Sequence, residues 1–216
     1  MHCEALDRLI DGGVIAVVRG IDQEDAIPVS RALVKGGVRA VEVTADTPGA
    51  MNMIEVVSGD LGADALVGVG TVLDAETARA ALLSGAEFVV SPSLHRDVID
   101  LGNRYGVPVI PGVTTPTEAI TAYQAGADVV KLFPASVLGP DYLAALGGPL
   151  SQIPVISTGG IDKENAGRFI AAGAVAVGAG SSIVNDEAIE RGEFDRVTES
   201  ARDLVESVEQ ARSDLP

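Results

Sequence analysis

The stretch "YQAGADVVKLF" (residues 123–133) joins the end of a segment with helical periodicity to a short apolar run through a Gly-Ala turn. The same arrangement recurs in "LLSGAEFVVSP" (82–92) and "IAAGAVAVGAG" (170–180), and with Gly-Gly at the turn in "LVKGGVRAVEV" (33–43). Glycine is common just after the last residue of a helix, and short runs rich in Val and Ile are typical of buried strands. The repeated unit therefore predicts helices that alternate with strands.

Eight apolar segments of this kind lie along the chain, at 13–19, 38–44, 65–71, 87–93, 107–113, 128–134, 153–158 and 174–180. Segments with helical periodicity lie between them, for example 22–37, 74–86, 95–106, 115–127 and 162–174, and several begin with an Asp or Thr that can cap a helix. Eight alternating units in roughly 200 residues predict a (β/α)8 TIM barrel. An open, doubly wound sheet would give the same local pattern, but the regular count of eight favours the barrel.

The chain shows no linker or low-complexity segment. We therefore expect a single domain over residues 1–216, with a short N-terminal helix and an amphipathic C-terminal helix from residue 194 onward. No apolar run approaches the ~20 residues that span a bilayer, and the acidic N-terminus is not typical of a signal peptide. The single cysteine, Cys3, cannot form an internal disulfide. These features predict a cytoplasmic protein in a reducing compartment.

The composition is strongly acidic. Thirty-one Asp and Glu residues oppose fifteen Lys and Arg residues, which gives a net charge of −16, while 47% of the residues are hydrophobic. Such a surface repels nucleic acid and anionic membranes, so neither is an expected partner. The charge suggests a halophilic protein from a high-salt cytoplasm, where salt screens self-repulsion. An ordinary acidic protein is the alternative.

In TIM barrels the active site lies where the strands end at their carboxyl side. These ends carry Arg19, Glu42, Thr44, Gly70, Thr71, Ser91, Pro92, Pro111, Gly112, Lys131, Phe133, Pro134, Thr158, Gly159, Gly160 and residues 178–181. Glu42 and Lys131 stand out because each is an ionisable residue inside an otherwise apolar strand. One such residue could simply pair with another charge inside the barrel. Two opposite charges on different strands favour a nucleophile and an acid/base.

A lysine amine can act as a nucleophile only when it is neutral, and a free lysine has a pKa near ~10.4. Burial beside Val130, Leu132 and Phe133 would favour the neutral amine, whereas an ionised Glu42 close by would oppose it. We therefore expect Glu42 to be protonated at that stage, or to act through a water. A neutral amine condenses with a ketone to an iminium, which stabilises an enamine on the adjacent carbon while a carboxylate moves protons. This is the chemistry of a class I aldolase, which needs no metal.

The sequence predicts neither a metal nor a cofactor. His2, Cys3 and His95 are the only soft or borderline ligands, their spacing does not match a zinc site, and His95 is expected to open a helix. "GVGT" (68–71) does not continue into a nucleotide-binding motif. The glycines of "STGGI" (157–161) and "GAGSS" (178–182) suggest a phosphate site at the ends of the last two strands, although tight turns also use such glycines.

Seven segments, "GGVRAVEVT", "VGVGTVLD", "EFVVSPS", "PVIPGVTTPTE", "VVKLFPAS", "ISTGGI" and "GAGSSIV", resemble in their order the 2-keto-3-deoxy-6-phosphogluconate (KDPG) and KHG aldolases. The resemblance covers roughly residues 5 to 205. It implies a homotrimeric barrel that cleaves a phosphorylated keto-sugar acid, KDPG, to pyruvate and glyceraldehyde 3-phosphate in an Entner-Doudoroff-type pathway. It also implies roles for individual residues. Lys131 would form the Schiff base, and Glu42 would be the general acid/base. Thr71 would contact the pyruvyl carboxylate, Pro92 and Phe133 would line the pyruvyl pocket, and Thr158 would lie near the aldehyde half. The phosphate would be held by Gly159, Gly160, Gly180 and Ser181.

The sequence departs from the family pattern after the second strand. Relatives typically read E-[VI]-T-x-R-[TS], with an arginine that helps to bind the substrate carboxylate, whereas this chain has Asp46 at that position. An acid there repels a carboxylate, so we expect Arg19 to supply the missing charge. The alternative is that Thr71 and backbone amides bind the carboxylate alone and more weakly. The C4 epimer of KDPG and 4-hydroxy-2-oxoglutarate stay open as substrates. A sugar-phosphate epimerase, a thiamin-phosphate-synthase-like barrel and a barrel that only binds an anion are the other readings.

Overall fold

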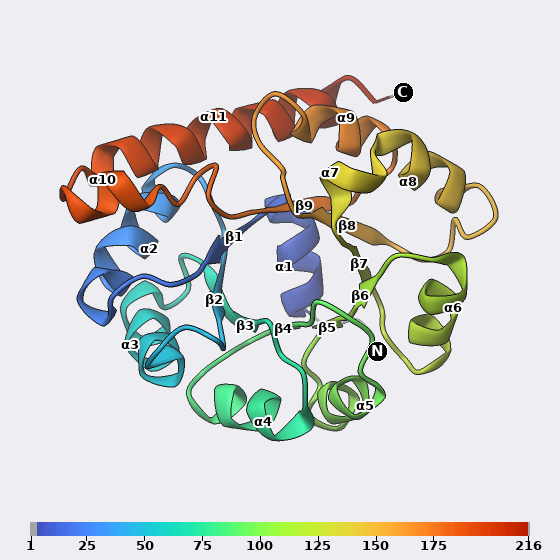
Figure 1. Cartoon of the computed structure of the whole chain (residues 1–216), viewed down its shortest axis with the longest axis horizontal. Helices are drawn as coiled ribbons and strands as arrows, with labels where there is room; N and C mark the ends of the chain where they lie inside the picture. Colours follow the sequence, from blue (N-terminus) through green and yellow to red (C-terminus); the bar gives the residue numbers. More distant parts are fainter. Residues whose placement is uncertain (1–3, 216) are drawn as a thin grey trace.

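The computed structural model describes residues 4–215, and its strands form one parallel sheet (Figure 1). The strands are β1 (Val14–Val18), β2 (Ala40–Thr44), β3 (Leu66–Gly70), β4 (Val89–Val90), β5 (Val109–Ile110), β6 (Gly112–Val113), β7 (Val130–Leu132), β8 (Val155–Thr158) and β9 (Ala176–Ala179). Their spatial order is β5-β4-β3-β2-β1-β9-β8-β7-β6. The first and last members of this order, β5 and β6, are separated by one residue in the chain, so the sheet curls into a barrel as predicted.

The barrel closes through the fifth predicted segment, 107–113, which the structure divides in two. β5 pairs with β4, whereas β6 pairs with β7. Pro111 stands between them and has no N–H to give to a ladder, but its carbonyl accepts a hydrogen bond from the Lys131 N–H at 2.9 Å. Eight predicted segments therefore become nine strands around the same barrel.

Side chains alternate between the barrel interior and the helix layer, as strand geometry requires. An inner cluster fills the half of the barrel at the amino ends of the strands. Its buried members are Leu6, Leu9, Ile15, Ala40, Leu66, Phe88, Val90, Ile110, Val129, Ile156 and Ala176. Two residues further along three of these strands lie Glu42, Lys131 and Thr158, which share the inward parity. The sequence period alone thus brings these polar groups to the carboxyl end of the same interior.

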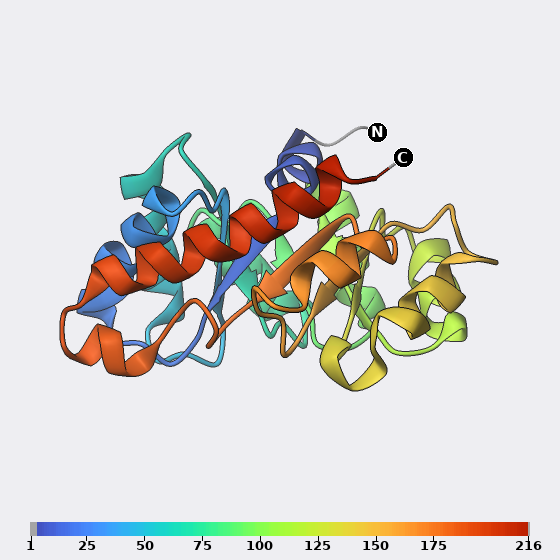
Figure 2. The same ribbon diagram turned by 90° about the horizontal axis from the view of Figure 1, so that it is seen from above.

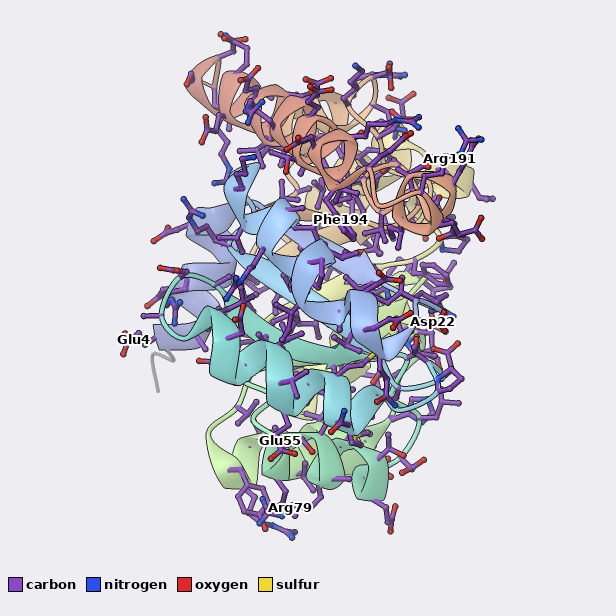
Figure 3. The ribbon with its side chains drawn as sticks, turned by 90° about the vertical axis from the view of Figure 1, so that its left-hand side faces the viewer. Glu4, Asp22, Glu55, Arg79, Arg191 and Phe194 are labelled. Carbon is purple, nitrogen blue, oxygen red and sulfur yellow. The ribbon has the colours of Figure 1, made fainter. Side chains whose placement is uncertain are left out.

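The helices surround the barrel. They are α1 (Glu4–Gly12), α2 (Ala26–Lys35), α3 (Ala50–Leu61), α4 (Ala75–Leu83), α5 (Arg96–Tyr105), α6 (Pro116–Gln124), α7 (Ala135–Leu138), α8 (Pro140–Gly147), α9 (Ala166–Ala171), α10 (Asp186–Glu190) and α11 (Phe194–Ser213), with a 3-10 turn η1 at Gln23–Asp25. Two predicted caps are present: Asp74 accepts the Thr77 N–H, and Thr115 forms a capping box with Glu118. Figure 3 shows α2, α3 and α4 side by side on one flank, with Glu55 and Arg79 on the outer surface.

The N-terminal helix α1 lies across the amino end of the barrel (Figure 2). Its residues Leu6 and Leu9 belong to the inner cluster. Arg212 of α11 secures α1 by donating to the carbonyls of Ile10 and Asp11, at 2.5 and 2.8 Å. The predictions that concern His2 and Cys3 lie outside the described residues. Within residues 4–215, no helix has the length and apolar character needed to cross a membrane.

Candidate active site

Glu42 projects into the barrel from the middle of β2, where only 3% of the residue is exposed. Its carboxyl group lies over Gly70 of β3, because a Cβ built on Gly70 would stand 2.7 Å from Glu42 Cγ and closer still to the carboxyl. Burial raises the pKa of Glu42, and the charge of Asp46 adds to this, while the positive charges of Lys131 and Arg19 oppose it. The net direction is upward, so the protonated acid is favoured at a higher pH than for an ordinary glutamate.

Lys131 enters the same interior from β7, on the opposite side of the barrel from β2 (Figure 1). It is 6% exposed, and its two register partners are Gly112 and Ile156. The amine Nζ lies 4.9 Å from the centre of the Phe133 ring. The amine is therefore enclosed by the barrel wall and an aromatic face. Its charge acts on Glu42, which places the two ionisable groups within electrostatic reach of each other.

Arg19 follows β1 at the barrel mouth and contacts two groups from neighbouring strand ends. Its Nη1 donates to Asp46 Oδ2 at 2.6 Å, and its Nη2 donates to Thr71 Oγ1 at 2.7 Å. Thr71 itself has a φ of 58°, the one positive φ among the non-glycine residues between 4 and 215. Such a backbone is unfavourable for threonine, and residues held this way cluster at functional sites. The expected guanidinium is thus present at the rim, and it is already paired with Asp46.

The glycine loops after β8 and β9 lie together beside the lysine strand. Gly159 and Gly160 have φ values of 99° and 70°, which other residues rarely adopt. Gly159 approaches the ring of Phe133 so closely that a Cβ would stand 3.0 Å from it. Ser182 Oγ donates to the Ile161 carbonyl at 2.7 Å and so links the two loops. Gly180 and Ser181 belong to the second of these loops, next to the first because Thr158 pairs with Gly178.

Pro92 stands at the end of β4 on the inward parity. A Cβ on Gly112 would overlap the Pro92 carbonyl, so Gly112 allows the β4 and β6 ends to approach each other. Gly112 is also a register partner of Lys131, which brings Pro92 to the same level of the barrel. Thr158, at the end of β8, is 8% exposed and lies against Gly178. A Cβ built on Gly178 would stand only 2.5 Å from Thr158 Oγ1, so this glycine also leaves room for a neighbouring residue.

Four residues that the sequence did not single out support the lysine strand and the loop after β8. Thr114 Oγ1 donates to the Phe133 carbonyl at 3.0 Å, and Tyr142 OH donates to the Thr114 carbonyl at 2.6 Å. Glu118 accepts the Thr114 N–H at 2.9 Å, and this bond lowers the pKa of Glu118 against its partial burial. Ser136 is the fourth, because its Oγ would stand only 2.3 Å from a Cβ on Gly160. "TTPTE" carried the capping-box signal, but nothing local pointed to Tyr142.

Within residues 4–215, no three His, Cys, Asp or Glu side chains gather as metal ligands would. His95 directly precedes α5, as predicted, and its Nε2 lies 2.8 Å from Ser93 Oγ. The groups at the barrel mouth are therefore an amine, a buried carboxyl, a guanidinium and glycine loops.

The model of the KDPG and KHG aldolase family matches residues 6–200. The chain belongs to this family. A 2-dehydro-3-deoxy-phosphogluconate aldolase of Treponema pallidum is 39% identical over 206 residues, 95% of this chain and 96% of that protein. A 2-dehydro-3-deoxy-6-phosphogalactonate aldolase of Escherichia coli is 39% identical over 171 residues, 79% and 83% of the two chains.

Among solved structures of the family's fold, a KDPG aldolase from Legionella pneumophila superposes with a TM-score of 0.83 at 32% identity, covering 89% of this chain and 93% of that one. That structure holds pyruvate captured at low pH as a covalent carbinolamine. Like other members, this aldolase-family chain is a carbon–carbon lyase of the class I type. The epimerase-like and non-catalytic readings are set aside by this membership.

Proposed function

We propose that the protein is a Schiff-base aldolase that cleaves KDPG to pyruvate and glyceraldehyde 3-phosphate. The observation that carries the proposal is the burial of Lys131 and Glu42 on facing walls of one barrel interior, at the end where Arg19 and the glycine loops lie. Burying an ammonium group is costly, so a lysine in this place favours covalent chemistry over a surface role.

The proposed cycle uses the amine first. Lys131 Nζ attacks the C2 carbonyl of the substrate, and loss of water gives an iminium. Removal of the C4 hydroxyl proton then lets the C3–C4 bond break, with its electron pair moving into the iminium to form an enamine, and glyceraldehyde 3-phosphate leaves. Protonation of the enamine carbon and addition of water release pyruvate and restore the amine, so water and protons balance over the cycle.

Glu42 is assigned to the proton transfers. Because burial raises its pKa, its carboxyl group can both give and take a proton closer to neutral pH than an exposed glutamate can. The coulombic effect of Lys131 on Glu42 means that conversion of the amine to its covalent states changes the proton affinity of the acid. The lysine and the carboxyl thus act as a coupled pair.

The remaining assignments follow the position of each residue. Arg19 and Thr71, joined by a 2.7 Å hydrogen bond, bind the keto-acid carboxylate at the β1 and β3 ends. Pro92 and Phe133 wall the pyruvyl pocket, and Thr158 lies toward the aldehyde half. The backbone N–H groups of the loops then receive the phosphate at Gly159, Gly160, Gly180 and Ser181. In this scheme the substrate lies across the barrel mouth from β3 to β9.

Borohydride reduction in the presence of pyruvate tests the proposal. We expect a reduced pyruvyl group on Lys131, found by mass spectrometry of the digested protein, and no such group in Lys131→Met. An unmodified Lys131 peptide from active enzyme would remove the mechanism.

A second candidate substrate is the C4 epimer, 2-keto-3-deoxy-6-phosphogalactonate, because a relative 39% identical carries that name. Steady-state kinetics with both epimers and with 4-hydroxy-2-oxoglutarate ranks the three by kcat/KM, and we expect KDPG to rank first. We also infer a cytoplasmic homotrimer adapted to high salt, from the family resemblance and the net charge of −16. The solution mass, measured by sedimentation across a range of KCl concentrations, tests both the trimer and the salt adaptation.

A further inference from the structure

Asp46 occupies the barrel mouth but has no part in the proposed reaction. Its carboxylate accepts the hydrogen bond of Arg19 Nη1, while the other terminal nitrogen of the same guanidinium reaches Thr71. The side chains of Arg19 and Asp46 are 56% and 47% exposed, so packing alone does not fix their conformations. Two hydrogen bonds from opposite arms therefore decide how the guanidinium faces the site.

Both partners of Arg19 are themselves held in place. Thr71 is fixed by its left-handed backbone directly after β3. The loop that carries Asp46 is tied back to β1 and β2, because Thr47 Oγ1 accepts the Gly20 N–H at 2.9 Å and lies 3.0 Å from Thr44 Oγ1. The Asp46 carboxylate is thus carried by a turn whose position is held by hydrogen bonds.

We propose that Asp46 is a positioning residue that holds Arg19 against Thr71 and so aims the guanidinium at the keto-acid carboxylate. The inference rests on the proposed function and deepens it. Asp46 has a second, opposite effect, because its negative charge repels the anionic substrate and neutralises part of the charge of Arg19. The electrostatic environment of Glu42 supports the proximity of this pair to the reaction, since Asp46 raises and Arg19 lowers the pKa of that carboxyl.

Two variants separate the two effects. Asp46→Asn keeps an acceptor oxygen for Arg19 and removes the charge, so KM for the substrate should stay at or fall below the wild-type value. Asp46→Ala removes both, so Arg19 loses one of its two anchors and KM should rise about tenfold with kcat within about twofold. In an Arg19→Ala background, Asp46→Ala should no longer raise KM, because its effect runs through Arg19.

The pH profile adds a measurement that a purely structural role would leave unchanged. Asp46→Asn removes a negative charge that raises the pKa of Glu42, so the limb of the kcat profile set by Glu42 should move to lower pH. The matched control is another arginine–aspartate pair, in which Arg31 Nε donates to Asp60 Oδ2 at 2.8 Å between the outer helices α2 and α3. Asp60→Asn and Asp60→Ala should leave both KM and the pH profile unchanged.

Three results would overturn the role of Asp46: a wild-type KM in Asp46→Ala, an equal rise in both Asp46 variants, or a rise that persists without Arg19. Borohydride trapping of pyruvate by the wild-type enzyme separates this failure from a failure of the proposed function. Trapping with any of these three kinetic results removes only the positioning role, whereas absence of trapping removes the aldolase mechanism itself.

Discussion

Replacing Glu42 by glutamine should slow the reaction and stabilise the fold at the same time. Glutamine cannot exchange a proton, and loss of a general acid/base typically costs about 10²–10⁴-fold in rate. The fold responds in the other direction because the barrel raises the pKa of Glu42 above its ordinary value of 4.5, mainly through burial. A buried carboxylate therefore opposes folding at neutral pH, and the neutral amide of similar shape relieves that opposition.

The pH dependence gives the sign. A carboxyl with a raised pKa in the folded state binds more protons than in the unfolded state, so its contribution to stability is present below about pH 4.5 and is lost as pH rises through the folded pKa. The advantage of Glu42→Gln should accordingly grow from pH 4.5 upward and then level off. Each pKa unit of elevation corresponds to about 1.4 kcal/mol, or roughly 3–6 °C in melting temperature for a chain of this size.

Thermal and urea unfolding of both proteins between pH 4 and 8 measures this difference. The Lys131→Met background provides an internal check, because the lysine charge lowers the pKa of Glu42 and its removal should enlarge the gain from glutamine. The rate at which pyruvate methyl protons exchange in heavy water measures the predicted loss of proton transfer in Glu42→Gln. A variant that is less stable than wild type at pH 8, or that exchanges these protons at the wild-type rate, would refute the reasoning about Glu42.

Two further predictions concern the support of the site. Gly70→Ala should lower kcat at least about tenfold, because its methyl group would displace the Glu42 carboxyl. Gly59→Ala in α3 has open space around it, so it should leave kcat unchanged and stabilise the fold by about 0.5–1 kcal/mol. Steady-state kinetics and thermal unfolding test both variants, and equal kcat values would contradict the placement of Glu42. Thr115→Ala should cost about 1 kcal/mol of stability in urea unfolding through loss of the capping box, and Thr115→Ser should recover most of it. Equal unfolding midpoints for wild type and Thr115→Ala would show that the α6 cap does not stabilise the fold.

Much of the fold was predictable because a barrel repeats one local pattern. Every described strand falls inside one of the eight predicted segments, and the Gly-Ala turns occur where helices end. The bounds were less predictable, since pairing depends on a neighbour that local sequence does not show. In segment 87–93, for example, only Val89–Val90 forms ladder pairs, and 107–113 divides at Pro111 into one strand that pairs with β4 and another that pairs with β7.

The site was predictable where a residue conflicted with its surroundings. Glu42 and Lys131 could be found because charges are rare in apolar strands. The contacts between segments could not be found in this way, because they join residues far apart in the chain. Tyr142 and Thr114 are 28 positions apart, and the Arg19–Asp46 pair spans 27. The sequence indicated that Arg19 could replace a missing charge, but not that Asp46 would hold it.

The glycines of the inner wall show why composition underdetermines such a site. Gly70 leaves room for the Glu42 carboxyl, Gly178 for the Thr158 side chain, and Gly160 for Ser136. From the sequence, each glycine indicates only a possible turn or flexible point. In the structure, the absence of a Cβ leaves space that the side chain of a neighbouring strand or loop occupies. The neighbour comes from an adjacent strand or loop, so its identity follows from register and not from local sequence. The chemistry therefore depends on these glycines as well as on the lysine and the glutamate, because a methyl group added at Gly70 or Gly178 would displace the Glu42 carboxyl or the Thr158 side chain.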